Sequence, residues 1–298
     1  MATATTTPQT AQVVQPQAKP AQYYLDRVVR YALLIGIGLV LLSPFILSFL
    51  GTFKTNREIL AYPPTIIPTE WHPENWGRVW ETSAGPGATF PRWVLNTVIL
   101  CIINIITQVL FCSMAAFAFA RLTFPGKELV FSGMLATMMI PGAITLVPGY
   151  VLIAGKLGWV NNYAAILVPG AVGAFGIFLL TQFFKALPRE LEEAAYIDGA
   201  SRWQIYKDVI LPLAKPALLT LVILTFQAQW NNFLGPLLYF QDAAMYTMTV
   251  GLSFFRQQYQ TAWNLVLVGS MLNAIPVLIL FFLFNKYYIE GISYAGLK

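Results

Sequence analysis

The sequence predicts an all-α membrane protein with six transmembrane helices and both termini in the cytoplasm. Three observations lead to this class. The mean hydropathy is +0.62 and only 10% of the 298 residues are charged, whereas about a quarter of the residues of a soluble globular domain are charged. Six apolar stretches are each long enough to cross a bilayer. The Lys and Arg residues are divided unevenly among the segments that join these stretches.

The spans follow from the length and purity of the apolar stretches. Crossing ~30 Å of hydrocarbon requires about 20 apolar residues. All 18 Lys and Arg and all 13 Asp and Glu lie outside the six stretches, as expected if a charge at the bilayer centre costs at least ~2.5 kcal/mol. The predicted spans are residues 31–50, 93–120, 129–153, 164–184, 217–237 and 264–285.

The orientation follows from the Lys and Arg residues alone. Twelve of the 18 lie in segments 1–30, 121–128, 185–216 and 286–298. The alternate connecting segments have a similar total length and carry the other six. Because cytoplasmic segments are enriched in Lys and Arg, the first set is predicted to face the cytoplasm. The Trp-rich segment around Trp71, Trp76 and Trp80 then lies outside, where indole rings suit the membrane boundary.

The chain divides into four predicted parts. Residues 1–22 read as a disordered cytoplasmic tail, rich in Ala, Thr, Gln and Pro. Residues 23–92 hold the first span and an external segment, residues 93–286 form a five-helix core, and residues 287–298 form a cytoplasmic C-terminal tail.

Cofactor, metal and nucleic-acid roles have little support in the composition. Cys101 and Cys112 lie in one apolar run and read as buried hydrophobic residues. His72 is the lone histidine and has no neighbouring metal-ligand set. The basic residues flank apolar spans and form no patch, so the expected surroundings are membrane lipid, with no nucleic acid and no cofactor.

The loop 188–216 concentrates charge in a chain that mostly lacks it. Pro188 and the acidic residues after it predict the start of a helix, and Gly199 predicts its left-handed end. Ser201 and Gln204 have the spacing of a capping box that starts a second helix. That helix is predicted to carry an apolar stripe, formed by Tyr206, Val209, Ile210 and Leu213. These features leave open an amphipathic hairpin that lies on lipid.

Several motifs resemble a known family. Within the loop these are Glu193, Ala194, Ala195, Asp198, Gly199 and Ala200, followed by Leu211 and Pro212. The group resembles the EAA loop of binding-protein-dependent ABC importer permeases. The stretches FARLTFPG at 119–126, WNNFLGPL at 230–237 and GISYAGLK at 291–298 resemble segments of the carbohydrate-importing, maltose-type branch, although Tyr294 replaces a more usual small residue.

This resemblance implies a fold, partners and roles. The fold would be that of a type I ABC importer permease, a multi-pass protein of a bacterial or archaeal cytoplasmic (inner) membrane. The loop would be the coupling helix that docks in a groove of an ABC ATPase dimer, where Glu193 would meet a basic residue and Gly199 would allow the turn. A second permease subunit, expected to be a different chain, and an extracytoplasmic solute-binding protein would complete the transporter. The solute would be a sugar or oligosaccharide, with glycerol phosphate as the alternative.

Uncharged amides within the predicted spans suggest a solute path. Amides can hydrogen-bond hydroxyl groups without imposing a charge preference, although each could equally be interhelical polar contact. The candidate path residues are Trp230 and six amides, Asn104, Gln108, Gln227, Asn231, Asn232 and Asn273. The cluster at 227–232 is the strongest candidate among them. Pro141, Pro148, Pro169, Pro236 and Pro276 fall in spans and could bend them.

Two other classes of function fit less well. A stand-alone secondary transporter usually couples through intramembrane carboxylates, and the predicted spans contain none. A membrane enzyme would need a cluster of His, Asp or Glu or an activated nucleophile, which one histidine and scattered acids do not supply. The sequence also has no phosphate-binding G-x-x-x-x-G-K-[ST] motif, so ATP would be hydrolysed by a separate subunit and this chain would not itself be an enzyme.

Overall fold

The computed structural model of this chain describes residues 21–255 and 261–296. Most of the predicted tail 1–22 therefore lies outside the described residues, as does part of the outward connection before the last span. Within the described part of the chain the regular structure is helical, and an isolated antiparallel bridge joins Ser83 and Thr89. The chain separates into two units, Met1–Ser48 and Phe49–Lys298.

The first unit contains most of helix α1, Ala21–Gly51, which includes the predicted first span. Its apolar side chains are exposed along the length of the helix, from Val28 to Leu47. From Asp26 onward the helix is long and apolar enough to cross a membrane.

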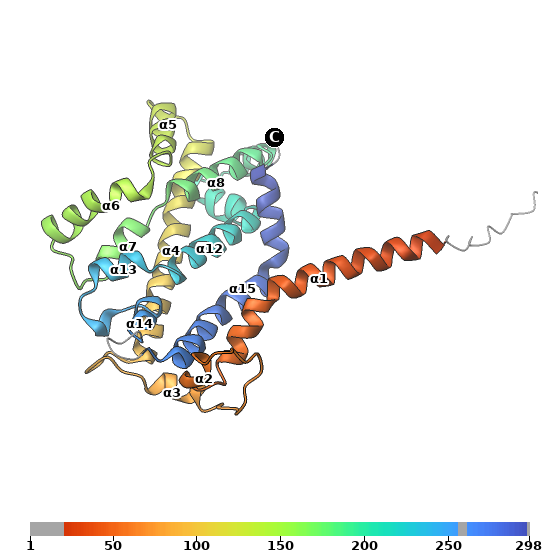
Figure 1. Ribbon diagram of the computed structural model, residues 1–298. Coiled ribbons are helices and arrows are strands. Elements are labelled where there is room, and N and C mark those ends of the chain that lie inside the picture. Colours follow the sequence, from red (N-terminus) through yellow and green to blue (C-terminus); the bar gives the residue numbers. More distant parts are fainter. Residues whose placement is uncertain (1–20, 256–260, 297–298) are drawn as a thin grey trace, which may run out of the picture. The chain divides into compact units, whose positions relative to one another are not determined.

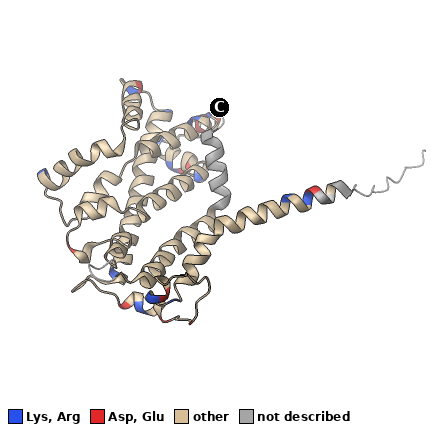
Figure 2. Cartoon of the chain, in the orientation of Figure 1, with Lys and Arg blue, Asp and Glu red and all other residues tan. Residues whose placement is uncertain are grey.

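The second unit is organised around α4, Phe90–Arg121, the helix that contains the predicted second span. Helices α8, Ala174–Ala186, and α12, Lys215–Trp230, pack against it (Figure 1). Along α4 and α12 the charged residues are confined to the helix ends, and the ribbon between them is uncharged (Figure 2). The last helix, α15, Trp263–Gly296, packs against α12 and continues through most of the predicted C-terminal tail.

Three predicted spans are interrupted where the sequence suggested continuous helices. Residues 129–153 form α5, Lys127–Thr137, then α6, Gly142–Tyr150, and the π-helix η1, Val151–Lys156, with a 93° bend at the break. Pro141 is the N-cap of α6, and Pro148 lies inside α6, three residues before η1 begins. Proline favours such breaks because it removes an N–H donor from the helical ladder. The prediction of one continuous helix at 129–153 is wrong in this respect.

The next spans also contain breaks. Residues 164–184 form α7, Ala164–Gly170, and α8, with an irregular segment at 171–173 just after Pro169. The predicted fifth span ends early: α12 stops at Trp230, and a separate helix α13, Leu234–Tyr239, follows. Among the residues that the structure describes, four helices are long and apolar enough to cross a membrane, or up to six if each bent pair is counted as one span.

The described side chains form two buried cores. One joins Phe90, Trp93 and Leu100 of α4 to the connection that follows α13. The other joins Phe117 and neighbouring residues of α4 to α8 and to the loop before α12. Because α4 contributes to both cores, one helix links the two ends of the second unit.

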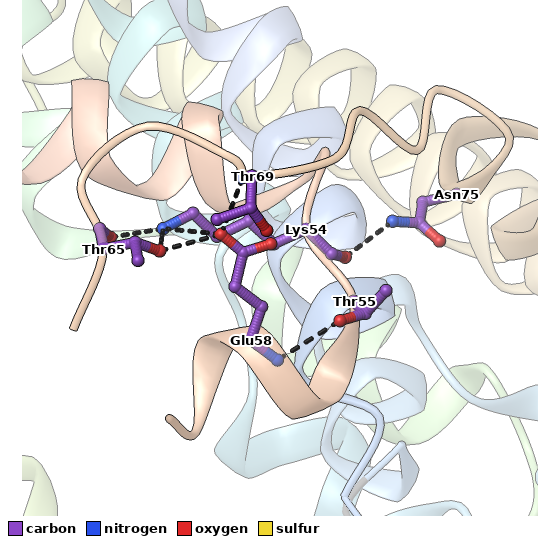
Figure 3. A network of polar contacts seen from close by, with 6 residues as sticks. All are labelled: Lys54, Thr55, Glu58, Thr65, Thr69 and Asn75. Carbon is purple, nitrogen blue, oxygen red and sulfur yellow. Dashed lines mark hydrogen bonds and ion pairs between the residues drawn. The ribbon is translucent and has the colours of Figure 1, made fainter. Parts of the chain in front are cut away.

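A polar network fixes the segment that follows α1. It lies beside the short helices α2, Asn56–Ile59, and α3, Asn75–Glu81. The buried Lys54 ammonium donates to the carbonyl and, at 2.9 Å, to the hydroxyl of Thr65 (Figure 3). Glu58 Oε1 accepts from the Thr65 hydroxyl at 2.8 Å and from the Thr69 N–H at 2.9 Å. Although burial raises the pKa of Glu58, these hydrogen bonds bring it below its ordinary value.

Candidate functional site

The loop 188–216, called the EAA loop below, forms a helical hairpin. Its first helix is α9, Glu190–Ile197, shorter than the sequence suggested. Gly199 follows with φ of +84°, its N–H bonds the Tyr196 carbonyl, and the Ala200 N–H bonds the Ala195 carbonyl at 3.0 Å. This pattern is the Schellman motif, which requires a left-handed residue at the position of Gly199. The predicted left-handed helix end is therefore confirmed.

The second arm starts with the predicted capping box. The Ser201 side chain accepts from the Gln204 N–H, and the Gln204 side chain accepts from the Ser201 N–H at 2.8 Å. Three residues of α10, Arg202–Gln204, then lead into the π-helix η2, Ile205–Ile210, the short α11, Leu211–Leu213, and α12.

The predicted apolar stripe on this arm is only partly correct. Tyr206 and Ile210 are buried, but Leu213 is exposed, and Ile205 is buried in its place. Pro212 explains the shift, since it lacks an N–H and its ring would collide with the carbonyl four residues earlier in an α-helix. The π-helix before Pro212 changes the spacing of side chains, so a 3.6-residue pattern does not describe it.

The motif residues of the EAA loop fall into two groups. Glu193, Ala194, Asp198, Gly199 and Pro212 are exposed. Ala195, Ala200 and Leu211 are half-buried and pack on the core beneath the loop. The exposed motif residues thus form an outward face of carboxylates and small side chains. The half-buried motif residues attach the loop to the core beneath it.

Exposed apolar side chains at the same hairpin were not identified from the sequence. Tyr196 and Ile197 are 67% and 85% exposed, and Leu191 and Trp203 are also exposed. Grouped apolar side chains on a surface mark interaction sites. A signal existed in the sequence, because Tyr196 and Ile197 are the only large apolar residues in the stretch 192–202, which is otherwise small or polar.

An ion pair to α4 was also missed. Arg121 Nε lies 2.5 Å from Glu192 Oε1, and the side chains are only 5% and 16% exposed. Arg121 also donates from Nη2 to the Leu187 carbonyl at 2.9 Å. Burial raises the pKa of the Glu192 carboxyl, and the Arg121 guanidinium opposes that change. The sequence placed both residues near helix ends but gave no sign of their pairing.

Among the predicted path residues, Asn104 and Gln108 face the break between α7 and α8. Gln108 Nε2 donates to the Gly170 carbonyl at 3.0 Å, and a side chain on Gly170 would collide with the Asn104 amide. The Gly173 N–H meets the sulfur of Cys112 at 3.5 Å. Gln108 and Cys112 of α4 therefore bind backbone groups at the break between α7 and α8, which favours the structural alternative for Gln108.

The amide cluster at the end of α12 meets α15. Trp230 Nε1 donates to the Asn273 carbonyl at 2.9 Å. Asn231 is exposed, donates to the Gln227 carbonyl at 3.0 Å, and accepts from Asn273 Nδ2 at 3.4 Å. Asn232 instead turns toward Gly235 and accepts its N–H at 3.2 Å. The structure thus brings Gln227, Trp230, Asn231 and Asn273 together and leaves the Asn231 amide accessible.

The connection after α13 is tied to the start of α4. Trp93 Nε1 donates to the Ala243 carbonyl at 2.7 Å, and Asn96 Nδ2 donates to the carbonyls of Ala244 and Tyr246, both at 2.9 Å. Asn161, which has φ of +53°, accepts the N–H groups of Gln241 and Asp242. Within the described residues no three or more His, Cys, Asp or Glu side chains are grouped to hold a metal ion.

Comparison with known proteins adds a family and a fold. The family described as "Binding-protein-dependent transport system inner membrane component" matches residues 108–290. The chain is similar to the trehalose/maltose transport system permease protein MalG of Thermococcus litoralis, with 33% identity over 90% of this chain and 97% of that protein. It is also similar to the sn-glycerol-3-phosphate transport system permease protein UgpE of Escherichia coli O6, with 31% identity over 87% of this chain and 93% of that protein.

The fold has a solved counterpart. A chain of a bacterial ABC transporter involved in the import of the acidic polysaccharide alginate superimposes with a TM-score of 0.77. The superposition covers 92% of this chain and 100% of that chain, at 23% sequence identity.

Proposed function

We propose that this chain, which belongs to the family of binding-protein-dependent transport system inner membrane components, forms the membrane path for a sugar or oligosaccharide. The observation that carries the proposal is the EAA loop, where the family's motif residues form a left-handed turn and an exposed face. A permease needs such a surface because it must bind the separate chain that hydrolyses ATP and couple its own conformational change to that hydrolysis.

The ATPase is proposed to dock on the outward face of α9. Glu193 supplies a carboxylate to a basic residue of the ATPase, and the small side chain of Ala194 allows close approach, while Ala195 and Ala200 hold the loop on the core beneath it. Asp198 and Gly199 form the turn at the edge of the contact, and Leu211 and Pro212 shape the second arm. The exposed Tyr196 and Ile197 beside them would be covered in such a complex.

The remaining parts of the transporter follow from the same family. We infer six spans with both termini in the cytoplasm of a bacterial or archaeal cell, an orientation supported by the distribution of Lys and Arg. A second permease, an ATPase dimer and an extracytoplasmic solute-binding protein complete the assembly. The two bent helix pairs would each supply one of the six spans.

The sugar preference rests on the chemistry of the path. In the cluster at the end of α12, the side chains of Asn231 and Asn273 offer neutral donors and acceptors near Trp230, and Gln227 contributes its backbone carbonyl. Neutral amides and an indole suit a hydroxyl-rich neutral solute. Glycerol phosphate is the competing solute because of the similarity to UgpE, but its anionic group would gain no cationic partner from these residues.

A reconstituted transporter tests the proposal. The chain is co-expressed with its ATPase and partner permease and placed in vesicles with the binding protein. ATP hydrolysis and uptake are then measured with maltose, trehalose, longer oligosaccharides and sn-glycerol 3-phosphate. A neutral sugar is expected to stimulate both activities. Stimulation by glycerol phosphate alone would replace the sugar assignment, and uptake without any bound ATPase would favour a stand-alone secondary transporter.

Substitution of Glu193 tests the docking face. Glu193→Ala is expected to weaken ATPase retention by a few-fold, because one charge-assisted contact at the rim of an interface is lost. The exposed side chain makes normal membrane insertion the expected background. The measurement is affinity co-purification of the ATPase in detergent at increasing salt. Retention equal to that of the unmodified chain at every salt concentration would remove Glu193 from the contact.

Substitution of Asn231 tests the path. Asn231→Ala is expected to raise the KM for uptake about three- to tenfold, because a hydrogen bond to the solute is worth roughly 1 kcal/mol. Assembly with the ATPase should not change, since the side chain is exposed. Gln241→Ala removes an exposed amide from the connection after α13 and is the matched control. Identical uptake kinetics in both variants would count against Asn231 lining the path.

A further inference from the structure

One face of α4 contacts both arms of the EAA loop. Ser113, Phe117 and Arg121 are spaced four residues apart and therefore lie on the same side of the helix. The Ser113 hydroxyl lies 2.7 Å from the Tyr206 hydroxyl, and the Phe117 and Tyr206 rings are 5.3 Å apart. One turn further on, Arg121 pairs with Glu192 of α9.

Arg121 is the point where three helix ends meet. Its guanidinium contacts the Leu187 carbonyl at the end of α8 and the Glu192 carboxylate in the first turn of α9. A cation in the last turn of α4 and an anion in the first turn of α9 are each favoured by the helix dipole. Arginine suits the position because its guanidinium can donate from Nη2 to the Leu187 carbonyl while its charge stays beside the Glu192 carboxylate.

The burial of the pair makes it hard to separate. If α9 moved away from α4, it would leave a guanidinium and a carboxylate without partners in a poorly hydrated place, which is strongly unfavourable. At its other end α4 holds the connection after α13 through Trp93, Asn96 and Thr97. With 32 residues, α4 reaches from one end to the other, about 48 Å at 1.5 Å per residue.

We propose that Arg121 is a positioning residue that fixes α9 to α4 and α8, so that a displacement of the EAA loop moves α4 with it. The proposal rests on the proposed function, because it assigns a route for motion that starts at the ATPase. Glu193 and its neighbours would make the contact, and Arg121 would transmit it without touching the ATPase or the solute.

The test compares coupling with assembly in the complete transporter. Arg121→Gln, Glu192→Gln and the exchanged pair Arg121→Glu with Glu192→Arg are reconstituted with the ATPase, the partner permease and the solute-loaded binding protein. Three quantities are measured: the ATPase retained on purification, the ATP hydrolysis stimulated by loaded binding protein, and the solute taken up per ATP. Glu190→Gln, which neutralises an exposed carboxylate of the same helix, is the matched control.

Each single variant is expected to retain the ATPase but to lose stimulated hydrolysis or uptake per ATP about tenfold. The exchanged pair should regain roughly a third of the activity. Recovery stays partial because a carboxylate at position 121 cannot donate to the Leu187 carbonyl and both reversed charges oppose the helix dipoles. Glu190→Gln should remain within about twofold of the unmodified chain.

The outcomes separate the two proposals. If the unmodified chain couples and both single variants couple equally well, Arg121 has no positioning role. If the exchanged pair is as stable as the unmodified chain in a thermal melt yet recovers nothing, the role is also excluded. Should Arg121→Gln fold poorly, Glu192→Gln and the exchanged pair decide, because Glu192→Gln leaves α4 unchanged. Failure of the unmodified chain to retain any ATPase would instead overturn the proposed function.

Discussion

A chain carrying Gly199→Ile is expected to insert into the membrane normally but to lose its ATPase partner. Gly199 has φ of +84°, and no heavy atom lies within 4 Å of the position that a Cβ would occupy. The cost is therefore in the backbone and not in a collision. A left-handed conformation costs an ordinary L-residue roughly 1–2 kcal/mol, and more for a β-branched one.

The consequence of that strain is local. The turn depends on the Gly199 N–H bonding the Tyr196 carbonyl and the Ala200 N–H bonding the Ala195 carbonyl. If residue 199 leaves the left-handed region, both bonds are lost and α9 changes direction relative to the second arm. A cost of about 2 kcal/mol or more means a greater than tenfold fall in the fraction of loops with the docking geometry.

Gly199→Asn is the matched control, because asparagine tolerates left-handed geometry and the surrounding space is open. Both variants are compared by membrane expression, ATPase co-purification and solute-stimulated hydrolysis. We expect Gly199→Asn to resemble the unmodified chain and Gly199→Ile to lose ATPase retention at least tenfold. Equal retention by the two variants would show that the turn is not needed for docking.

The features of this loop that the sequence predicts are those determined by residues close to one another along the chain. A left-handed glycine and a capping box depend on neighbours at most five positions away, and both are present as predicted at Gly199 and Ser201. The apolar stripe failed for an equally local reason, because Pro212 enforces a π-helix before it. The predicted 3.6-residue stripe takes no account of the effect of Pro212 on the turn before it.

The breaks within the spans could not be derived from hydropathy, which averages over the whole segment. Residues 129–153 are uniformly apolar, yet the chain bends by 93° between α5 and α6. Pro141 and Pro169 marked two of the three breaks. The third, after Trp230, has no proline at the helix end, and neither hydropathy nor an adjacent proline marks it.

The tertiary pairings were outside the reach of a single sequence. Arg121 and Glu192 are 71 positions apart, and each had a sufficient local explanation as a charge near a helix end. Asn104 and Gln108 are four positions apart and therefore share a face of α4, but their neighbours at the α7–α8 break cannot be read from the sequence. Shared faces can be read from spacing, whereas what a face meets depends on how the helices pack.

The second large effect is expected at Gly251, in α14, Met248–Phe254, where a methyl group has no room. A Cβ at this position would overlap the Trp93 indole, and even the third-nearest atom, Cζ3, would be only 2.7 Å away. The indole cannot move aside easily, because it is 1% exposed and its Nε1 donates to the Ala243 carbonyl. Overpacking of a buried site of this kind costs about 1–3 kcal/mol.

Gly251→Ala should therefore lower the thermal stability of the purified chain and loosen the connection after α13, because Trp93 is one of its anchors. Gly77→Ala is the matched control: it adds the same methyl group to a glycine of α3, with no atom within 4 Å of the new Cβ. Adding Trp93→Phe to Gly251→Ala provides space while giving up the hydrogen bond to Ala243, so stability should return only in part. Thermal melts in detergent give the comparison. A melting temperature for Gly251→Ala equal to that of Gly77→Ala would mean that α14 can shift away from α4 without cost, and the tie between α4 and the connection would then be weaker than its buried hydrogen bonds imply.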